Sequence, residues 1–86
     1  MLRIGYKPAF IRNFKKLPVS LQEEAQERIQ LFANDPQHPS LRVHKLKGRL
    51  RGKSSFSVNY QFRVIFFYEN PRTAVLLEIG DHAIYE

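Results

Sequence analysis

The sequence predicts a single α+β domain, residues 1–86, in which an N-terminal strand and a two-helix hairpin precede a three- to four-stranded antiparallel sheet. Two patterns predict this order: apolar residues recur at helical spacing early in the chain and alternate with strand period later. A length of 86 residues allows one modest core. Helices and strands segregated in this way pack as helices on one face of an antiparallel sheet.

The first elements are expected to be a short strand and a short helix. The alternation of Leu2–Tyr6 predicts the strand. Apolar residues then recur at i, i+4 and i+7 from Phe10, which predicts an amphipathic helix over Pro8–Leu17. Pro18 is expected to end that helix.

The second helix is predicted from its two ends. Ser20-Leu21-Gln22-Glu23 matches a capping box, in which the serine hydroxyl accepts a free N–H and the glutamate reaches back to the helix start. Asn34-Asp35-Pro36 is expected to end the helix, because proline disfavours a helical conformation in the residue before it. The residues expected on the buried face are Leu21, Ala25, Ile29 and Phe32.

The second half of the chain is expected to form the sheet. Phe56–Tyr68 alternates with strand period, and a turn at Asn59 or Tyr60 would divide it into two strands, so both arrangements remain open. After the turn Glu69-Asn70-Pro71-Arg72, Thr73–Ile79 is expected to return antiparallel. The inward residues are predicted to be Phe56, Val58, Tyr60, Phe62, Val64, Phe66 and Tyr68 on the first stretch and Val75, Leu77 and Ile79 on the second.

The segment His44–Lys53, called the basic segment below, carries a cation at every second position. If it is extended, the cations share one side, spaced by about 6.6 Å, and suit a polyanion such as nucleic acid. The alternative is a solvated edge strand whose charges discourage pairing with other strands. The five cations are Lys45, Lys47, Arg49, Arg51 and Lys53, and the opposite side would hold His44, Leu46 and Leu50.

The net charge of +6 is concentrated around this segment, since the stretch from Pro36 to Tyr68 holds seven basic residues and no acidic one. A local positive field attracts anions and weakens with salt. RNA or DNA is a better partner than a membrane, because the charged side of the segment has no large apolar residue to insert.

Composition excludes other classes. The chain has no cysteine, which excludes disulfides, a Cys-based zinc site and a thiol nucleophile. Its longest apolar run, Val64–Tyr68, is too short to span a bilayer. A cytoplasmic protein without a membrane partner is expected.

Three ordered motifs carry a resemblance to a known family: His44-Lys-Leu-Lys-Gly48, then Phe62-Arg63-Val64-Ile65-Phe66, then Leu77-Glu-Ile-Gly80-Asp-His82-Ala-Ile-Tyr85. Together they resemble the RelE/ParE toxin superfamily, and most closely its RelE and YafQ-like branch of mRNA interferases from type II toxin-antitoxin systems. The resemblance covers nearly the whole chain and implies the RelE-like microbial RNase fold.

The resemblance implies a toxin that cuts messenger RNA, commonly in the ribosomal A site, and so inhibits translation. In this family the ribose 2′-hydroxyl attacks the neighbouring phosphate without a metal or other cofactor. The family partner is a cognate antitoxin that masks or distorts the active site. The expected partners are therefore the antitoxin, mRNA and the ribosome.

The resemblance also implies roles for two catalytic residues. Arg63 corresponds to the family's arginine in the central strand, whose fork can hold a phosphate as charge builds on it; the alternative is an ion pair with Glu78 or Asp81. His82 matches the histidine of the family's C-terminal Gly-x-His pattern and could both accept and donate a proton. Its alternative is a cap on the end of the strand.

Two further candidates follow from the same resemblance. His44 opens the His-x-Leu-x-Gly motif of the YafQ-like branch, with a core histidine as the alternative. Tyr85 lies where the family often has an aromatic close to the cut nucleotide; it would stack on a base or contact the phosphate, or else anchor the tail. The lysines of the basic segment would hold RNA or stabilise charge.

The chain departs from the family at the general base, and other functions stay open. YafQ-like enzymes carry acidic residues in the segment where this chain has Ser55 and Gln61, so the base is unassigned; Glu78 would be a substitute only if its side chain faces the same cleft. The ParE branch shares the fold but inhibits DNA gyrase. A third possibility is an RNA-binding module that does not cut.

Overall fold

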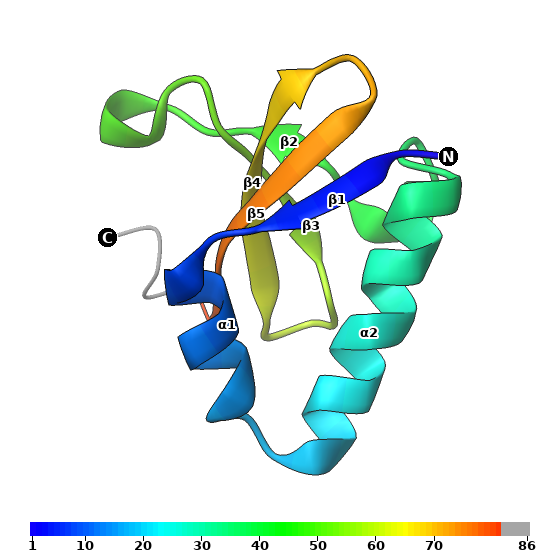
Figure 1. Cartoon of the computed structure of the whole chain (residues 1–86), viewed down its shortest axis with the longest axis vertical. Coiled ribbons are helices and arrows are strands. Elements are labelled where there is room, and N and C mark those ends of the chain that lie inside the picture. The colour runs from blue at the N-terminus through cyan, green and yellow to red at the C-terminus, as the bar shows by residue number, and fades with distance from the viewer. Residues whose placement is uncertain (82–86) are drawn as a thin grey trace.

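A strand and two helices open the chain, as the sequence predicts. The computed structural model describes residues 1–81. In it, β1 spans Arg3–Tyr6, α1 spans Pro8–Lys15 and α2 spans Val19–Asn34. Figure 1 shows the two helices joined by a short connection beside the twisted sheet, with the N-terminus next to the end of α2. No helix within residues 1–81 is long and apolar enough to cross a membrane.

The predicted capping box is wrong. Pro18 is the N-cap of α2, so Ser20 lies within the first turn, where its hydroxyl makes no capping bond. The Pro18 carbonyl accepts from the backbone N–H groups of Leu21 and Gln22, both at 3.0 Å. The Gln22 side chain donates to the Leu17 carbonyl at 2.9 Å, which ties α2 to the connection before it.

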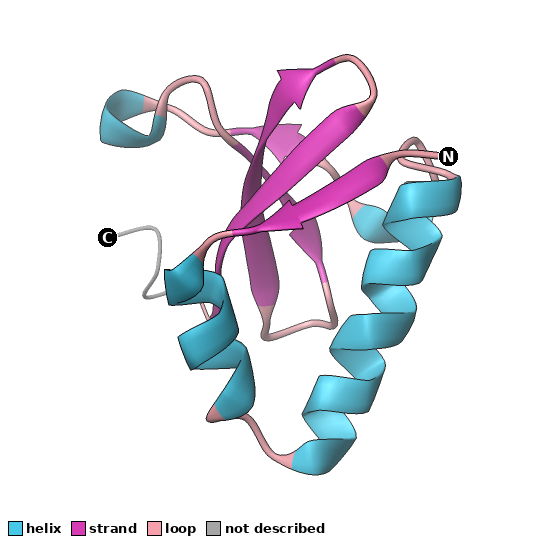
Figure 2. Ribbon diagram, in the orientation of Figure 1, coloured by secondary structure: helices cyan, strands magenta, loops and turns pink. Residues whose placement is uncertain are grey.

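Within the described residues the sheet has five strands in the order β1-β5-β4-β3-β2, and Figure 2 shows the strands and the helices together. The later strands are β2 (His44–Lys45), β3 (Ser54–Ser57), β4 (Arg63–Asn70) and β5 (Thr73–Gly80), and short 3₁₀ turns occupy Pro39–Leu41 and Gly48–Leu50. β2 to β5 pair antiparallel, as predicted. The sheet is nevertheless mixed, because β1 joins its edge parallel to β5, a pairing that the sequence pattern did not predict.

The stretch Phe56–Tyr68 is divided into two strands by a turn at Asn59. The Asn59 Oδ1 accepts from the backbone N–H groups of Gln61 at 2.9 Å and Phe62 at 2.8 Å. An asparagine side chain that bonds to the backbone two residues ahead stabilises a turn in place of a strand. Tyr60, predicted in the core, is therefore 88% exposed at the tip of the turn.

A bulge in β5 changes which residues face the core. Ile65 pairs with Glu78 but Phe66 pairs with Leu76, so Leu77 is an extra residue in β5. An extra residue shifts the alternation of side chains by one position. The residues of β5 in the core cluster are Ala74, Leu76 and Ile79 rather than the predicted Val75, Leu77 and Ile79.

The core is built around Phe32 of α2. Its ring lies 4.5 Å from the ring of Phe56 and 4.7 Å from that of Phe66, and all three side chains are fully buried. Phe10 of α1 joins the same cluster, so both helices pack on one face of the sheet. The predicted buried face of α2 is confirmed. At the rim of this core, partial burial raises the pKa of the Tyr68 phenol above its ordinary value.

The basic segment is not an extended strand. Only its first two residues pair, as β2, and the chain then turns with positive φ at Gly48 (66°) and Gly52 (87°). The backbone N–H of Leu46 donates to the Lys53 carbonyl at 2.9 Å, which closes the segment into a loop. The prediction of two alternating faces is therefore wrong, although four of the five cations are exposed.

Replacing Phe32 tests the core. Phe32→Ala should lower the free energy of unfolding by about 3–5 kcal/mol, because a buried phenylalanine is removed and leaves a cavity between two rings. Urea unfolding followed by circular dichroism measures the change. Tyr60→Ala serves as the control and should change stability by less than about 0.5 kcal/mol, because its side chain is exposed. Equal losses in the two variants would contradict this packing.

Candidate functional site

Arg63 stands at the start of β4, where three strands lie side by side. It pairs with Ser57 of β3 and with Gly80 at the end of β5. Its Nη1 donates to the Ser57 hydroxyl at 2.8 Å. The Glu78 carboxylate accepts from Asn13 Nδ2 at 2.7 Å, so this acid is bonded to α1.

His44 lies on the same face of the sheet as Arg63. His44 pairs with Ser55 of β3, and Arg63 pairs with Ser57 of the same strand. Residues two apart in a strand point to the same face, so His44 and Arg63 share that face. From strand spacing and rise, the Cα atoms of His44 and Arg63 are about 12 Å apart. That face is opposite the one that carries Phe56 into the core. The alternative of a core histidine is wrong, because His44 is exposed.

The ring of His44 is held by the backbone. Its Nδ1 lies 3.2 Å from the carbonyl oxygen of Arg42. Because a carbonyl oxygen only accepts, this contact is a hydrogen bond when Nδ1 carries the proton. Neutral His44 then has its lone pair on Nε2, which is free to take a proton from a bound group.

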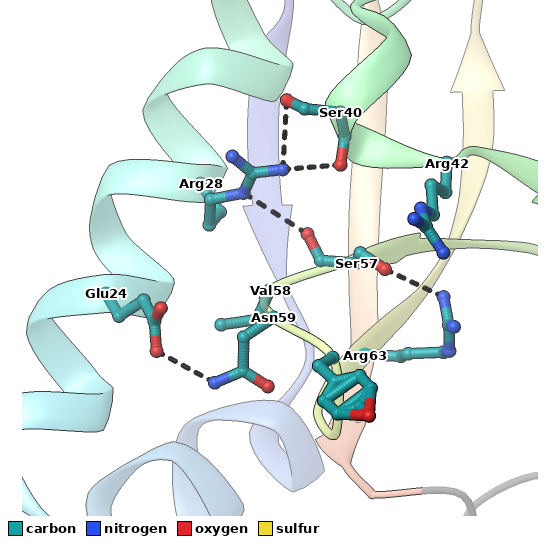
Figure 3. A pocket seen from close by; sticks show the side chains of 9 residues that line it. Glu24, Arg28, Ser40, Arg42, Ser57, Val58, Asn59 and Arg63 are labelled. Atoms are coloured by element: carbon teal, nitrogen blue, oxygen red, sulfur yellow. Dashed lines mark hydrogen bonds between the residues drawn. The ribbon is translucent and has the colours of Figure 1, made fainter.

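A cleft of about 310 Å³ opens beside Arg63, between α2, the turn Pro39–Leu41 and the β3–β4 loop. Figure 3 shows the Arg42 and Arg63 side chains pointing toward one another beside Ser57. No hydrogen-bond acceptor for the Arg42 guanidinium is found within residues 1–81. The cleft is lined by three arginines (Arg28, Arg42 and Arg63) and one acid (Glu24). The other lining residues include Ser57, Asn59 and Tyr60.

The third arginine of the cleft has a structural role. Arg28 Nη2 donates to the Ser40 carbonyl at 2.7 Å and to its hydroxyl at 3.2 Å, and Nε donates to the Ser57 carbonyl at 3.4 Å. These bonds connect α2 to the Pro39–Leu41 turn and to β3 (Figure 3). Because the guanidinium of Arg28 is used in these structural bonds, Arg42 and Arg63 are the arginines of the cleft that are placed to bind an anion.

Arg42 is the site residue that sequence reasoning missed. It closes the Pro39–Leu41 turn in a left-handed conformation, with φ 49° and ψ 48°, the one such non-glycine residue in the described chain. That conformation costs a residue with a side chain about 1–3 kcal/mol. Strain of this kind is concentrated at functional sites. Its position in the acid-free stretch from Pro36 to Tyr68 was the available signal.

Ser55 is a second unusual residue on the face that carries His44. It is fully buried, and its hydroxyl has no hydrogen-bond partner within the described chain. The structure places Ser55 between His44 and Ile65 in the sheet.

The remaining predicted residues are only partly placed by the structure. Lys45 lies in β2, Arg49 in the Gly48–Leu50 turn, and Lys47, Arg51 and Lys53 beside that turn. His82 and Tyr85 lie outside the described residues. Within residues 1–81, no three His, Asp or Glu side chains gather into a group that could hold a metal ion.

Comparison with solved structures identifies the fold. YafQ from E. coli strain BL21(DE3) matches with a TM-score of 0.79 and 16% sequence identity, over 98% of this chain and 97% of that one. The YoeB/ParE toxin from Agrobacterium tumefaciens matches with a TM-score of 0.77 and 12% identity, over 94% and 99%. The chain has the fold of these toxins.

A third match extends the same likeness. The toxin-antitoxin complex RelBE2 from Mycobacterium tuberculosis contains a chain with a TM-score of 0.67 and 19% identity, over 94% of this chain and 98% of that one. The α+β fold predicted from the resemblance is thus confirmed across nearly the whole length. No protein-family model and no curated protein sequence matches the chain.

Two variants of Arg42 separate the effect of its backbone strain on stability from the effect of its guanidinium on phosphate binding. Arg42→Gly should unfold about 4–8 °C higher than Arg42→Ala, because glycine adopts positive φ without strain and about 1 kcal/mol is regained. Thermal unfolding followed by circular dichroism compares them. Both variants lack the guanidinium, so both should lose affinity for a phosphate-bearing ligand equally. Equal unfolding temperatures would mean that the backbone at position 42 is relaxed.

Proposed function

We propose that the chain is the toxin of a type II toxin-antitoxin pair and acts as a metal-independent endoribonuclease that cleaves mRNA on the ribosome. The observation that carries the proposal is the convergence of Arg42 and Arg63 beside Ser57, on a sheet face that also presents His44. Two facing guanidinium groups favour an anion that several N–H donors can bind, such as a phosphate. The fold shared with YafQ supports the same class.

The proposed reaction is an internal transfer at one phosphodiester. The ribose 2′-oxygen bonds to the adjacent phosphorus and the bond to the 5′-oxygen breaks, which leaves a 2′,3′-cyclic phosphate and a 5′-hydroxyl. Arg63 and Arg42 donate to the non-bridging oxygens, where negative charge builds in the transition state. The Ser57 hydroxyl holds Arg63 in position through its 2.8 Å bond.

Two histidines are proposed to move the protons. His44 takes the proton of the 2′-hydroxyl through Nε2, because its Nδ1 is bonded to the Arg42 carbonyl. His82 follows Gly80 by two residues, and Gly80 pairs with Arg63, which supports a role for His82 in giving a proton to the leaving 5′-oxygen. Tyr85 is assigned to the neighbouring nucleotide. This scheme fills the place of the missing carboxylate base with His44.

The proposed partners follow from the fold and the charge. A cognate antitoxin is the expected protein partner, since RelBE2, with the same fold, is a toxin-antitoxin complex. The basic segment is proposed to contact mRNA and ribosomal RNA, because its exposed cations form a dense patch on one loop. Action on ribosomes implies a cytoplasmic protein.

A cleavage assay tests the proposal. Purified protein should cut a defined mRNA on programmed ribosomes and leave a 2′,3′-cyclic phosphate and a 5′-hydroxyl end. Arg63→Ala, His44→Ala and His82→Ala should each lower the rate by about 10²-fold or more, the scale of the acid–base or electrostatic catalysis that each variant removes. Single-turnover rates measured by gel electrophoresis give the comparison.

The controls keep the outcomes distinct. Arg72→Ala is the matched arginine variant and should cut like the wild type, because Arg72 lies in the turn between β4 and β5 and does not line the cleft. Products that carry a 5′-phosphate in place of the 5′-hydroxyl would refute the metal-independent transfer. No cutting, together with inhibition in a gyrase supercoiling assay, would instead assign the chain to the ParE class.

The basic segment is tested by salt dependence. Removing Lys45, Lys47 and Lys53 together should flatten the log–log slope of affinity against salt by about 0.7 for each single-strand phosphate that the protein no longer neutralises. Fluorescence anisotropy with a labelled oligoribonucleotide measures the slope. The matched control replaces Lys7, Lys15 and Lys16, which lie at α1, and should change the slope less. Equal slopes in the two triple variants would exclude the segment as the RNA-binding surface.

A further inference from the structure

We propose that the cleft beside Arg63 is a pocket for one nucleotide of single-stranded RNA, with the base stacked on the ring of Tyr60. Arg42 and Arg63, which line the same cleft, hold the phosphate of that nucleotide. The inference rests on the ribonuclease function proposed above and names the residue that would contact a base. None of the catalytic candidates already described supplies such a surface within residues 1–81.

Tyr60 is placed where a base could reach it. It lines the cleft together with both arginines, yet 88% of its surface is exposed. Aromatic side chains beside a cationic groove are the elements from which single-stranded nucleic-acid sites are built, since every base can stack on a ring. The exposed ring of Tyr60 therefore has the chemistry of a stacking surface.

The loop that carries Tyr60 is held rigidly. The Asn59 side chain accepts two backbone hydrogen bonds from the loop and donates to Glu24 Oε1 of α2 at 2.8 Å. The backbone N–H groups of Val58 and Asn59 also donate to the Phe62 carbonyl, at 2.9 and 3.3 Å. A surface that is ordered before binding loses less entropy on association. These bonds order the loop backbone on both sides of Tyr60 and leave its ring exposed for contact.

The size and charge of the cleft fit a single nucleotide. Its volume of about 310 Å³ is at the small end of the range for ligand pockets. Glu24, the acid that lines it, is bonded to Asn59, and Arg28 is bonded to Ser40 and Ser57. The two remaining cations attract a negatively charged partner. An RNA nucleotide supplies both that charge and a flat ring.

Variants of Tyr60 test the pocket by fluorescence anisotropy. The probe is a fluorescein-labelled, 2′-O-methyl oligoribonucleotide, which lacks the attacking hydroxyl and is not cut. Tyr60→Ala should weaken binding about tenfold, the scale of one base–aromatic stack. Tyr60→Phe should bind like the wild type, because the ring is kept. Gln61→Ala, the matched control in the same loop, should also bind normally.

A second arm tests the base itself. The same probe is prepared with one abasic position at a time along its length. One such probe should bind the wild type about tenfold more weakly and should show no further weakening with Tyr60→Ala, because the two changes remove the same stack. Effects that simply add at every position would overturn the stacking.

The outcomes separate this inference from the proposed function. If Tyr60→Ala binds every probe like the wild type while the wild type cuts mRNA, the nucleotide pocket is refuted and the ribonuclease stands. If the wild type binds none of the probes at low salt, the pocket is refuted whatever the cleavage assay gives. Thermal unfolding checks that each variant is folded. We expect the Tyr60 variants to fold, because the side chain is exposed and contributes little to the core.

Discussion

The shape of the candidate site depends on one amide side chain, that of Asn59. Its hydrogen bonds end β3, open the loop and fasten that loop to Glu24 on α2. The backbone N–H groups of Val58 and Asn59 close the same loop on the Phe62 carbonyl, so Tyr60 lies outside the strands and lines the cleft. Local hydrogen bonds that compete with the sheet ladder therefore shape the cleft beside Arg63.

Arg42 contributes to the candidate site through its backbone conformation, its carbonyl oxygen and its side chain. Its left-handed backbone ends the turn that begins at Pro39, its carbonyl orients the His44 ring, and its side chain approaches Arg63. Glycine is the residue that usually ends a turn in this conformation. Replacing Arg42 by glycine would therefore remove the backbone strain and the guanidinium together.

Much of the fold could be predicted from the sequence, and less of the site. Helix positions and the β4–β5 hairpin follow from periodicity and turn residues, which are local properties. The parallel pairing of β1 and the bulge at Leu77 depend on contacts between distant segments, which periodicity does not encode. Arg63 was found through the resemblance, whereas Arg42 and Tyr60 acquire their roles only when a turn brings them to one cleft.

The parallel pairing of β1 with β5 also affects how the protein is made. Arg3 pairs with Thr73, so the two strands are far apart in the sequence and the strand that completes the pair is synthesised well after β1. Contacts of such sequence separation form late and slow folding. The β1 edge of the sheet can therefore close only after β5 has been synthesised. Until then β1 lacks its partner strand, although the hydrogen bonds within α1 and α2 can already form.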